Sequence, residues 1–452
     1  MKVRIRIETE FGWGERRSHE IGVIERSSID ASEDSLGISL AEGKSILEEV
    51  QRAVLQDHVE DISEVERACP HCQAYLRAHD RRKRRVDTLF GRVTVEAPRI
   101  RMCMYGLPGF PEFKVGHSPL TRILRDNATP ELRRLQAELG GRHSFREAAH
   151  LLNELTPCAS QNHATIRNRL ASVAKALEER CDEAPTGTGV QSNPSEVPGF
   201  LDSAYVRSRP ENQRRNFEVI VGSIESETAE KRRFGLSQMG ADRPTEYLRS
   251  NLKAAGWMDS VAVTVFSDGD PALPRLVKNA TSADVHHALD WWHISVRIRH
   301  VETTFQTLLS QIEPDGAAEI AALVERLRWR IWHGQIDRAL DALDDLFRFA
   351  MRAREYTYRE SNDAALSAAS RAMDLRTYLS RNLSAIVNYG DRRQQGKAVS
   401  TSRAEGLVNE IANVRIGKKQ RMRWSPKAAH HVAIVSAAVL DGRLSSGYLA
   451  AA

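Results

Sequence analysis

The stretch GFLDSAYV (199–206) is the most informative part of this 452-residue chain, because it sets a carboxylate in the middle of an apolar, strand-like run. Burying Asp202 there costs free energy unless the carboxylate points to water, pairs with a cation or binds a metal ion. A second strand-like run, VAVTVFSDGD (261–270), reaches Asp268 near its end. We therefore expect a sheet whose strands carry acidic side chains.

Strand-like and helix-like segments alternate around these two runs. Further strands are predicted for NFEVIVGSI (216–224), KRRFGLSQM (231–239) and DVHHALD (284–290). Helices are predicted for TEYLRSNLKAAG (245–256) and PALPRLVKNA (271–280). This alternation is typical of a core that combines a sheet with helices.

The third acidic candidate is Glu405, in STSRAEGLVNEIANV (400–414). Apolar residues at helical spacing mark the expected buried face of this segment: Leu407, Val408, Ile411 and Val414. Glu405 stands beside that face. Taken singly, each acidic residue also has an ordinary interpretation, as a turn residue or a solvated charge.

Two of the three candidates have a close rival. Asp270 follows Asp268 by two residues, but Pro271 indicates that Asp270 already begins the next helix. Glu410 lies five residues beyond Glu405. That spacing turns it about 140° around a helix, so we expect Glu410 to face solvent.

Carboxylates on two strands and one helix suit phosphoryl transfer with two metal ions. Two Mg²⁺ ions about 3.5–4 Å apart need several hard oxygen ligands, which carboxylates provide. One ion lowers the pKa of the attacking water or 3′-hydroxyl, and the other stabilises the leaving oxygen.

At this point the chain resembles a known family over nearly its whole length. The motifs that carry the resemblance are LGISLAEGK, CPHC followed by DTLFGRVTVEAPR, SFREAAHLL, FLDSAYVRSR, VFSDGD, ALDWWHIS and SRAEGLVNEI with KKQRMRWSPKAAHH. Together they are similar to DDE transposases of bacterial insertion sequences, of the ISKra type, related to the mutator-like group and built on an RNase H-like core.

By this resemblance Asp202, Asp268 and Glu405 match the DDE triad and would hold two Mg²⁺ or Mn²⁺ ions. The spacings are 268 − 202 = 66 and 405 − 268 = 137 residues. The second gap is too long for a bare core, and residues from about 291 to 385 have a helical, charged pattern without a clear strand. An all-helical insertion over 300–390 is therefore expected.

The resemblance and the composition of each segment divide the chain into seven parts of an α+β, multi-domain fold. In chain order we expect an N-terminal hairpin and helix, a zinc-ribbon-like basic region, a helix-turn-helix region, a linker, the first part of the core, the helical insertion and the C-terminal core helices. The boundaries are 1–66, 67–118, 119–182, 183–198, 199–299, 300–390 and 391–452.

The cysteines of the second part resemble a zinc ribbon that is one ligand short. Cys69 and Cys72 form one CxxC pair, but the second pair has Cys103 alone. Structural Zn²⁺ needs four nitrogen or sulfur ligands. A zinc site and a degenerate site are both open interpretations.

Several polar residues are candidates for contact with DNA. A basic run lies between the cysteines: Arg81, Arg82, Lys83, Arg84 and Arg85. The second helix of the helix-turn-helix candidate offers groove or phosphate contacts: Gln161, Asn162, Arg167 and Arg169. A basic turn follows Glu405: Lys418, Lys419, Arg421 and Arg423. A solvated face and a plain helical bundle are the alternatives.

Two aromatic or imidazole groups complete the candidate DNA contacts. His293, with Asp290 three residues before it, matches a (Cys/Asp)-x-x-His motif of the family and would orient a phosphate or a flipped base. A core histidine bonded to Asp290 is the alternative. Trp424 lies in a basic context, so we expect it to be exposed and suited to base stacking, with core packing as the alternative.

The sequence thus predicts an enzyme that binds double-stranded DNA, namely terminal inverted repeats and target DNA, and works as a dimer or higher oligomer. The net charge of +5 favours an anionic partner only weakly. Five cysteines fit a reducing bacterial cytoplasm, and no apolar stretch approaches a membrane span. A resolvase-type RNase H-like nuclease and a DNA-binding regulator without catalysis are the alternatives.

Overall fold

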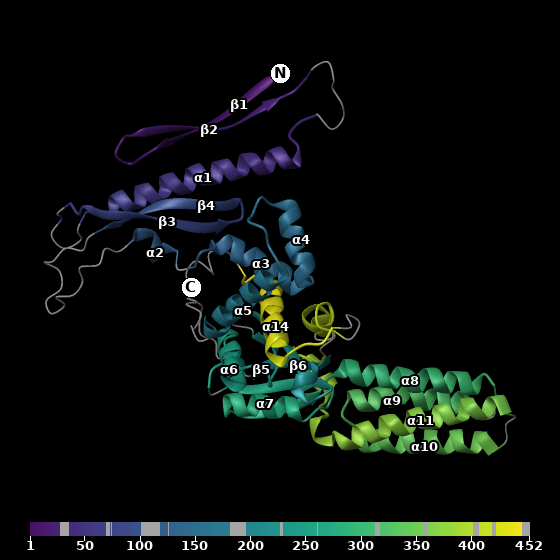
Figure 1. Ribbon diagram of the computed structural model, residues 1–452. Helices are drawn as coiled ribbons and strands as arrows, with labels where there is room; N and C mark the ends of the chain where they lie inside the picture. The colour runs from purple at the N-terminus through teal and green to yellow at the C-terminus, as the bar shows by residue number, and fades with distance from the viewer. Residues whose placement is uncertain are drawn as a thin grey trace. The chain divides into compact units, whose positions relative to one another are not determined.

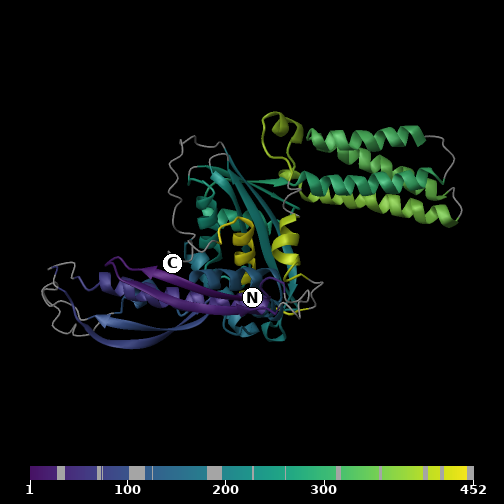
Figure 2. The ribbon, with the colours of Figure 1, turned by 90° about the horizontal axis from the view of Figure 1, so that it is seen from above.

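The computed structural model describes residues 1–27, 36–68, 73, 75–100, 118–124, 126–180, 196–226, 229–259, 261–311, 317–355, 359–400, 406–417 and 422–444. The fold is a mixture of helices and sheets in two units (Figures 1 and 2). The first runs from Met1 to Ala176 and the second from Leu177 to Asp441. No described helix combines the length and the hydropathy that a membrane span requires.

The first unit begins with the predicted hairpin and helix. Strands β1 (Lys2–Glu10) and β2 (Arg16–Glu25) pair antiparallel. Helix α1 (Leu40–Val65) starts at Ser39, whose side chain forms a capping box with Glu42. Asp57 of α1 is buried and accepts hydrogen bonds from side chains of both strands, which ties the helix to the hairpin.

A second hairpin and four helices complete the first unit. The hairpin consists of β3 (Ala78–Thr88) and β4 (Gly91–Ile100). The helices are α2 (Pro119–Ile123), α3 (Pro130–Arg142), α4 (Phe145–Leu155) and α5 (His163–Arg180). The prediction of helices over 119–181 is therefore confirmed for the described part of that range.

The sequence predicts that the glycines of PELRRLQAELGG end a helix, and this is wrong. Gly140 lies inside α3, which continues to Arg142. A Cβ at Gly140 would stand 2.9 Å from Cγ2 of Ile166 on α5. The glycine is there because two helices approach each other closely, not because the chain needs a left-handed cap.

The second unit contains a five-stranded sheet in the order β7-β6-β5-β8-β9. The strands are β5 (Glu196–Arg207), β6 (Asn216–Ser226), β7 (Ala229–Leu236), β8 (Ala262–Ser267) and β9 (Val285–Leu289). β5, β6 and β7 are antiparallel, whereas β5, β8 and β9 are parallel. The predicted linker over 183–198 is wrong at its end, because β5 already begins at Glu196.

Helices cover both faces of this sheet. α6 (Pro244–Ala254) contacts β7, and α7 (Ala272–Thr281) contacts β8 and β9. α14 (Pro426–Leu440) lies on the face opposite to α7 and packs on β6 and β7 (Figure 1). A Cβ at Gly235 of β7 would stand 2.6 Å from the Cβ of Ala433, so α14 and the strand are in direct contact there.

A helical bundle follows β9. Its helices run side by side in both ribbon views: α8 (Trp291–Leu309), α9 (Ala317–Trp332), α10 (Ile336–Glu355) and α11 (Arg359–Arg381) (Figures 1 and 2). They share one apolar core. The insertion predicted for 300–390 therefore begins earlier, at Trp291, because Asp290 caps α8 directly after β9.

The described part of the segment after Glu405 is a π-helix, Val408–Asn413. Leu407, Val408 and Ile411 are buried as predicted, but Val414 is 52% exposed. The Val414 amide donates to Asn409, five residues back. The wider π turn shifts the phase of the helix, which removes Val414 from the apolar face predicted from α-helical spacing.

We predict that Gly235→Ala destabilises the second unit. The new methyl group overlaps Ala433, and overpacking of this kind costs about 1–3 kcal/mol. Gly199→Ala is the control, because its Cβ meets only the Leu201 side chain, at 3.4 Å, and we expect it to be neutral or up to about 1 kcal/mol more stable. Urea unfolding followed by circular dichroism measures both. Equal midpoints for the two variants would contradict the prediction.

Candidate functional site

The site is organised by a small apolar cluster that crosses three parallel strands. Phe200 of β5 is the register partner of Phe266 of β8, and Phe266 is the partner of Ala288 of β9. These three residues pack together on one face of the sheet. The two phenylalanine rings stack with their centroids 5.2 Å apart.

An acidic residue follows each member of this cluster after two positions. They are Asp202, Asp268 and Asp290. Side chains two residues apart in a strand point to the same face. Asp202 lies within β5, whereas Asp268 and Asp290 are the first residues after the ends of β8 and β9. The joint metal-binding role of Asp202 and Asp268 stays a prediction.

The three carboxylates differ in their accessibility. Asp202 is half-buried and accepts a hydrogen bond of 2.7 Å from the amide of Ser203. Asp268 is exposed. Asp290 is completely buried, and its Oδ1 accepts from the amide of Trp292 at the start of α8. Asp202 and Asp268 thus reach solvent at least in part, whereas Asp290 serves as a helix cap.

Asp268 begins a tight loop between β8 and α7. Its Oδ1 accepts from the amide of Asp270 at 3.2 Å, and Asp270 in turn accepts from the amide of Ala272 at 2.8 Å. Gly269 between them has a φ of 107°, which side chains rarely adopt. The Asp270 carboxylate is therefore engaged by the first residue of α7, and the choice of Asp268 over Asp270 as metal ligand stays a prediction.

The helical bundle holds this loop from the other side. Tyr378 of α11 donates a hydrogen bond of 2.9 Å from Oη to the carbonyl of Asp268. A Cβ at Gly269 would stand 2.9 Å from Oδ1 of Asn382. The Arg297 guanidinium lies 4.1 Å from the centre of the Tyr378 ring. Burial raises the pKa of Tyr378, so its hydroxyl remains a donor at neutral pH.

His293 lies beside the cap formed by Asp290. Its Nε2 is 3.9 Å from Oδ2 of Asp290, which is too long for a hydrogen bond. The imidazole is a quarter exposed and meets the Trp292 ring edge to face. The alternative of a core histidine bonded to Asp290 is therefore not what this geometry shows, and the phosphate or base contact stays a prediction.

Glu405 lies outside the described residues, as do Cys69, Cys72, Cys103, Lys418, Lys419 and Arg421. The rival Glu410 is exposed, as predicted. Within the described ranges no three acidic, histidine or cysteine side chains gather in a way that could hold a metal ion. Cys158, which is described, is buried and free.

The basic run of the first unit is divided between the two faces of β3. Arg81, Lys83 and Arg85 alternate with Arg82 and Arg84. The Arg84 guanidinium donates to Thr121 Oγ1 at 3.2 Å and to the carbonyl of Leu124, so it joins the hairpin to α2. Arg81, Arg82, Lys83 and Arg85 are exposed, and their contact with DNA stays a prediction.

The polar residues of the α5 region also divide. Gln161 is 8% exposed, and its side-chain amide bonds to Gln136 and to the carbonyl of Ala159 inside the unit. Arg169 pairs with Asp126. Asn162 accepts from the amide of Thr165 and so caps α5. Arg167 is exposed, and its guanidinium contacts the side chain of Asn168.

Trp424 is 4% exposed, so the expectation of an exposed ring is wrong. Its backbone pairs with the end of β5, and the Arg415 guanidinium covers the ring at 4.8 Å. The alternative of core packing therefore holds for Trp424, with a cation–π contact from Arg415. Arg423, the neighbouring residue, is exposed as predicted.

Trp291, the first tryptophan of the ALDWWHIS motif, packs among other aromatic rings. Trp291 meets Trp332 and Tyr389 with ring centres 4.7 and 5.0 Å apart. Trp291 and Trp332 line a cavity of about 830 Å³ together with Trp329, which is 57% exposed. Tyr389 is fully buried and donates from Oη to the carbonyl of Leu289, which joins the segment after the bundle to β9.

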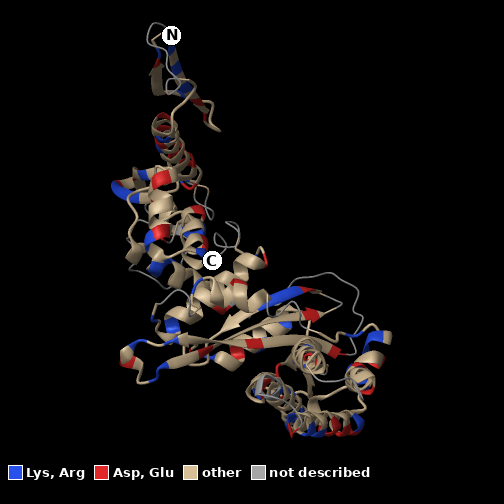
Figure 3. Cartoon of the chain, turned by 90° about the vertical axis from the view of Figure 1, so that its right-hand side faces the viewer, with Lys and Arg blue, Asp and Glu red and all other residues tan. Residues whose placement is uncertain are grey.

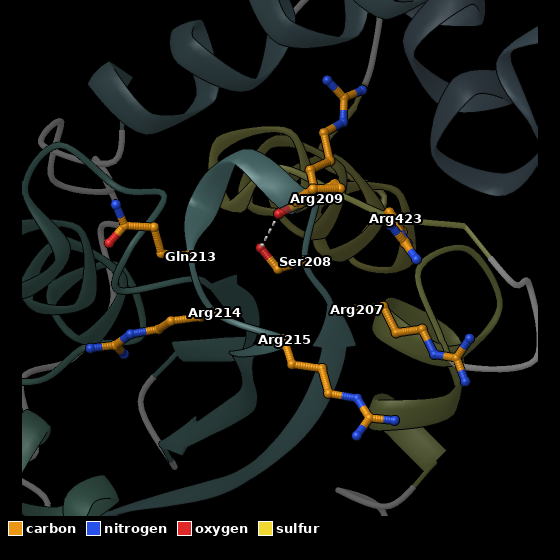
Figure 4. A pocket seen from close by; sticks show the side chains of 8 residues that line it. Arg207, Ser208, Arg209, Gln213, Arg214, Arg215 and Arg423 are labelled. Carbon is orange, nitrogen blue, oxygen red and sulfur yellow. Dashed lines mark hydrogen bonds between the residues drawn. The ribbon is translucent and has the colours of Figure 1, made fainter.

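Sequence reasoning missed a group of arginines at the tip of the β5–β6 hairpin. Arg207, Arg209, Arg214 and Arg215 line a cavity there together with Arg423 (Figure 4). The signal was present as RSRPENQRR (207–215), directly after the strand that carries Asp202.

His287 stabilises the end of β8, next to Asp268, in a pH-dependent way. Its Nε2 lies 2.8 Å from Ser267 Oγ, next to Asp268. Burial lowers the pKa of His287, and the negative charges of Asp268 and Asp270 oppose that effect. The neutral imidazole is therefore favoured in the folded state. The stability that this preference contributes is fully present above the unfolded pKa, about 6.5, and is lost as pH falls toward the folded value.

We predict that His287→Asn weakens this pH dependence. Between pH 7.5 and 5.5 the wild-type protein should lose more stability than the variant, as measured by urea midpoints at each pH. His286→Asn is the control, because His286 is the exposed neighbour on the same strand. If both variants retained the wild-type slope, protonation of His287 would not contribute.

Comparisons with known proteins place few constraints on this site. No family model matches the sequence, and no curated protein matches it. Among solved structures, the chain is similar to the Drosophila P element transposase strand transfer complex, with 12% sequence identity and a TM-score of 0.32. The match covers 68% of this chain and 92% of that chain. The function is therefore argued from the residues themselves.

Proposed function

We propose that this protein is a DDE transposase that binds the terminal inverted repeats of an insertion sequence, cleaves DNA strands there and transfers them to target DNA. One observation carries the proposal. Asp202 stands two positions after Phe200 in β5, Asp268 stands two positions after its register partner Phe266, just past the end of β8, and both residues are at least partly exposed. Hard oxygen ligands from adjacent strands suit metal-dependent phosphoryl transfer.

The strand order supports the same proposal. Three antiparallel strands are followed by two strands that are parallel to the first, in the order β7-β6-β5-β8-β9. We assign this arrangement to an RNase H-like core with the bundle inserted after its last strand. The motifs that resemble ISKra-type transposases lie on these elements: FLDSAYVRSR on β5, VFSDGD after β8 and ALDWWHIS across β9 and α8.

Asp202, Asp268 and Glu405 are the residues that would hold two Mg²⁺ or Mn²⁺ ions. Ala398, seven residues before Glu405, packs against the cluster of Phe200 and Phe266. The π-helix that starts three residues after Glu405 contacts β5 and β6. Both flanks of Glu405 therefore contact elements that carry the two aspartates. When bound, the ions would lower the pKa of the attacking hydroxyl and stabilise the leaving oxygen.

The described residues have separate tasks in this proposal. Asp202 is held on a strand and Asp268 on a capped loop, so the backbone positions both carboxylates. Tyr378 positions the loop through the carbonyl of Asp268 and leaves the carboxylate free. His293 lies next to this edge and would contact a phosphate or a base.

The remaining parts of the proposal concern DNA recognition and assembly. The first unit would recognise the DNA ends through Arg81, Arg82, Lys83 and Arg85 and through the region of Asn162 and Arg167. A zinc ion at Cys69, Cys72 and Cys103 would stabilise the neighbouring region. Bringing two DNA ends together would require at least a dimer. The protein would act in the bacterial cytoplasm.

We predict that Asp202→Asn, Asp268→Asn and Glu405→Gln each abolish cleavage of terminal-repeat DNA in Mg²⁺ or Mn²⁺. Removal of a metal ligand should cost at least a factor of about 100, because even partners behind the ligands cost 10–100-fold. Glu410→Gln is the matched control, since Glu410 is exposed and five residues away, and it should retain activity.

The assay should include a plasmid as target DNA. If the wild-type protein forms joined products and the three variants do not, the result supports strand transfer. Cleavage without joining by the wild-type protein would indicate a simple nuclease. Full cleavage by purified Asp202→Asn protein would contradict the proposal.

A further inference from the structure

A cavity of about 390 Å³ lies at the tip of the β5–β6 hairpin, apart from the carboxylates. Its lining is dominated by one kind of side chain. The residues are Arg207, Ser208, Arg209, Pro210, Gln213, Arg214, Arg215 and Arg423. Figure 4 shows Arg207, Arg215 and Arg423 extending toward one side of the hairpin and Arg214 toward the other.

The backbone that carries these arginines is well tied together. The amide of Ser208 donates to the carbonyl of Arg215 at 3.0 Å, which closes the hairpin. The amide of Trp424 donates to Arg207, and the amide of Arg209 donates to the carbonyl of Trp424. The buried Trp424 thus holds Arg423 against the hairpin tip, although 208 residues separate it from Arg215 (423 − 215 = 208).

The charges in this cavity are not neutralised within the described chain. All five arginines are exposed, and none forms an ion pair with a described carboxylate. The bundle is different, because acidic and basic side chains are interspersed on its helices (Figure 3). There Arg328 pairs with Glu302 and Arg376 with Asp344. Positive charge therefore accumulates at the hairpin tip, which favours an anionic partner.

We propose that this cavity, which we call the arginine cradle, binds backbone phosphates of a DNA strand. The planar guanidinium presents paired donors that match two phosphate oxygens. Five such groups distributed around one open cavity exceed what a single small anion requires, and they suit consecutive phosphates of a polymer. The choice of DNA as the polymer rests on the proposed function.

The position of the cradle indicates which phosphates it would contact. Arg207 follows Asp202 by five residues along the same strand. At about 3.3 Å per residue the two positions are roughly 16 Å apart. Because five is an odd separation, the two side chains point to opposite faces of β5, and the cradle would contact phosphates other than the one held at Asp202.

DNA binding of the full-length chain in EDTA tests this proposal without involving catalysis. The double variant Arg207→Gln/Arg215→Gln should bind a short duplex of mixed sequence about tenfold more weakly in fluorescence anisotropy, because each substitution removes a charge-assisted hydrogen bond. The slope of log affinity against log salt should fall by about 0.9 for each phosphate that the variant no longer neutralises.

The matched control removes the same charge elsewhere. Arg275 and Arg299 are exposed on α7 and α8 and lie outside the cradle. Arg275→Gln/Arg299→Gln should leave both the affinity and the salt slope close to those of wild type. Thermal unfolding by circular dichroism checks that each variant folds. If the double variant in the hairpin failed to fold, the single variant Arg423→Gln should still show a weaker affinity and a reduced slope.

Three outcomes would overturn the proposal. The first is an unchanged affinity and salt slope in the hairpin variants. The second is an equal loss of affinity in the control pair. The third is that inorganic phosphate saturates the cradle while removal of its arginines leaves DNA binding intact. The last would assign the cradle to a small anion. Cleavage by Asp202→Asn protein would refute the proposed chemistry without affecting this binding result, so the two failures are distinguishable.

Discussion

The packing of Phe200, Phe266 and Ala288 across three parallel strands is the contact on which the site depends. It sets the register of β5, β8 and β9, and the carboxylates follow from that register two residues later. A slip of one residue would turn every side chain of a strand to the opposite face. The Arg392 guanidinium lies 5.3 Å from the centre of the Phe266 ring, and it pairs with Glu196 at the start of β5. The cluster is thus held by charge as well as by apolar contact.

The bundle is attached to the sheet at the same edge. It begins at the cap of Asp290, returns through Tyr378 to the carbonyl of Asp268 and ends near Tyr389, which bonds to Leu289. The hydroxyl groups of Tyr378 and Tyr389 thus donate to backbone carbonyls at the ends of β8 and β9. A displacement of α11 would therefore be transmitted to the loop of Asp268. The bundle is part of the support of the site and not only an addition to its surface.

Positive charge illustrates how far a linear pattern can be interpreted. The run from Arg81 to Arg85 looks like one basic patch, but alternation in a strand divides it between two faces, and Arg84 is used inside the unit. The arginine cradle, in contrast, draws on two segments that are far apart in sequence and meet because Trp424 pairs with β5. A net charge of +5 describes neither arrangement.

Local periodicity and turn residues were enough to predict the strands and helices of the second unit, the exposure of Glu410 and the placement of Asp202 and Asp268 on neighbouring strand-like runs. Four features needed the folded chain: the role of Gly140 in helix packing, the burial of Trp424, the capping role of Asp290 and the phase of the helix at Val414. The first three depend on how a segment packs or ends in the fold, and the fourth depends on a change of helical pitch. The periodicity of a segment gives no information about its packing partners or about such a change.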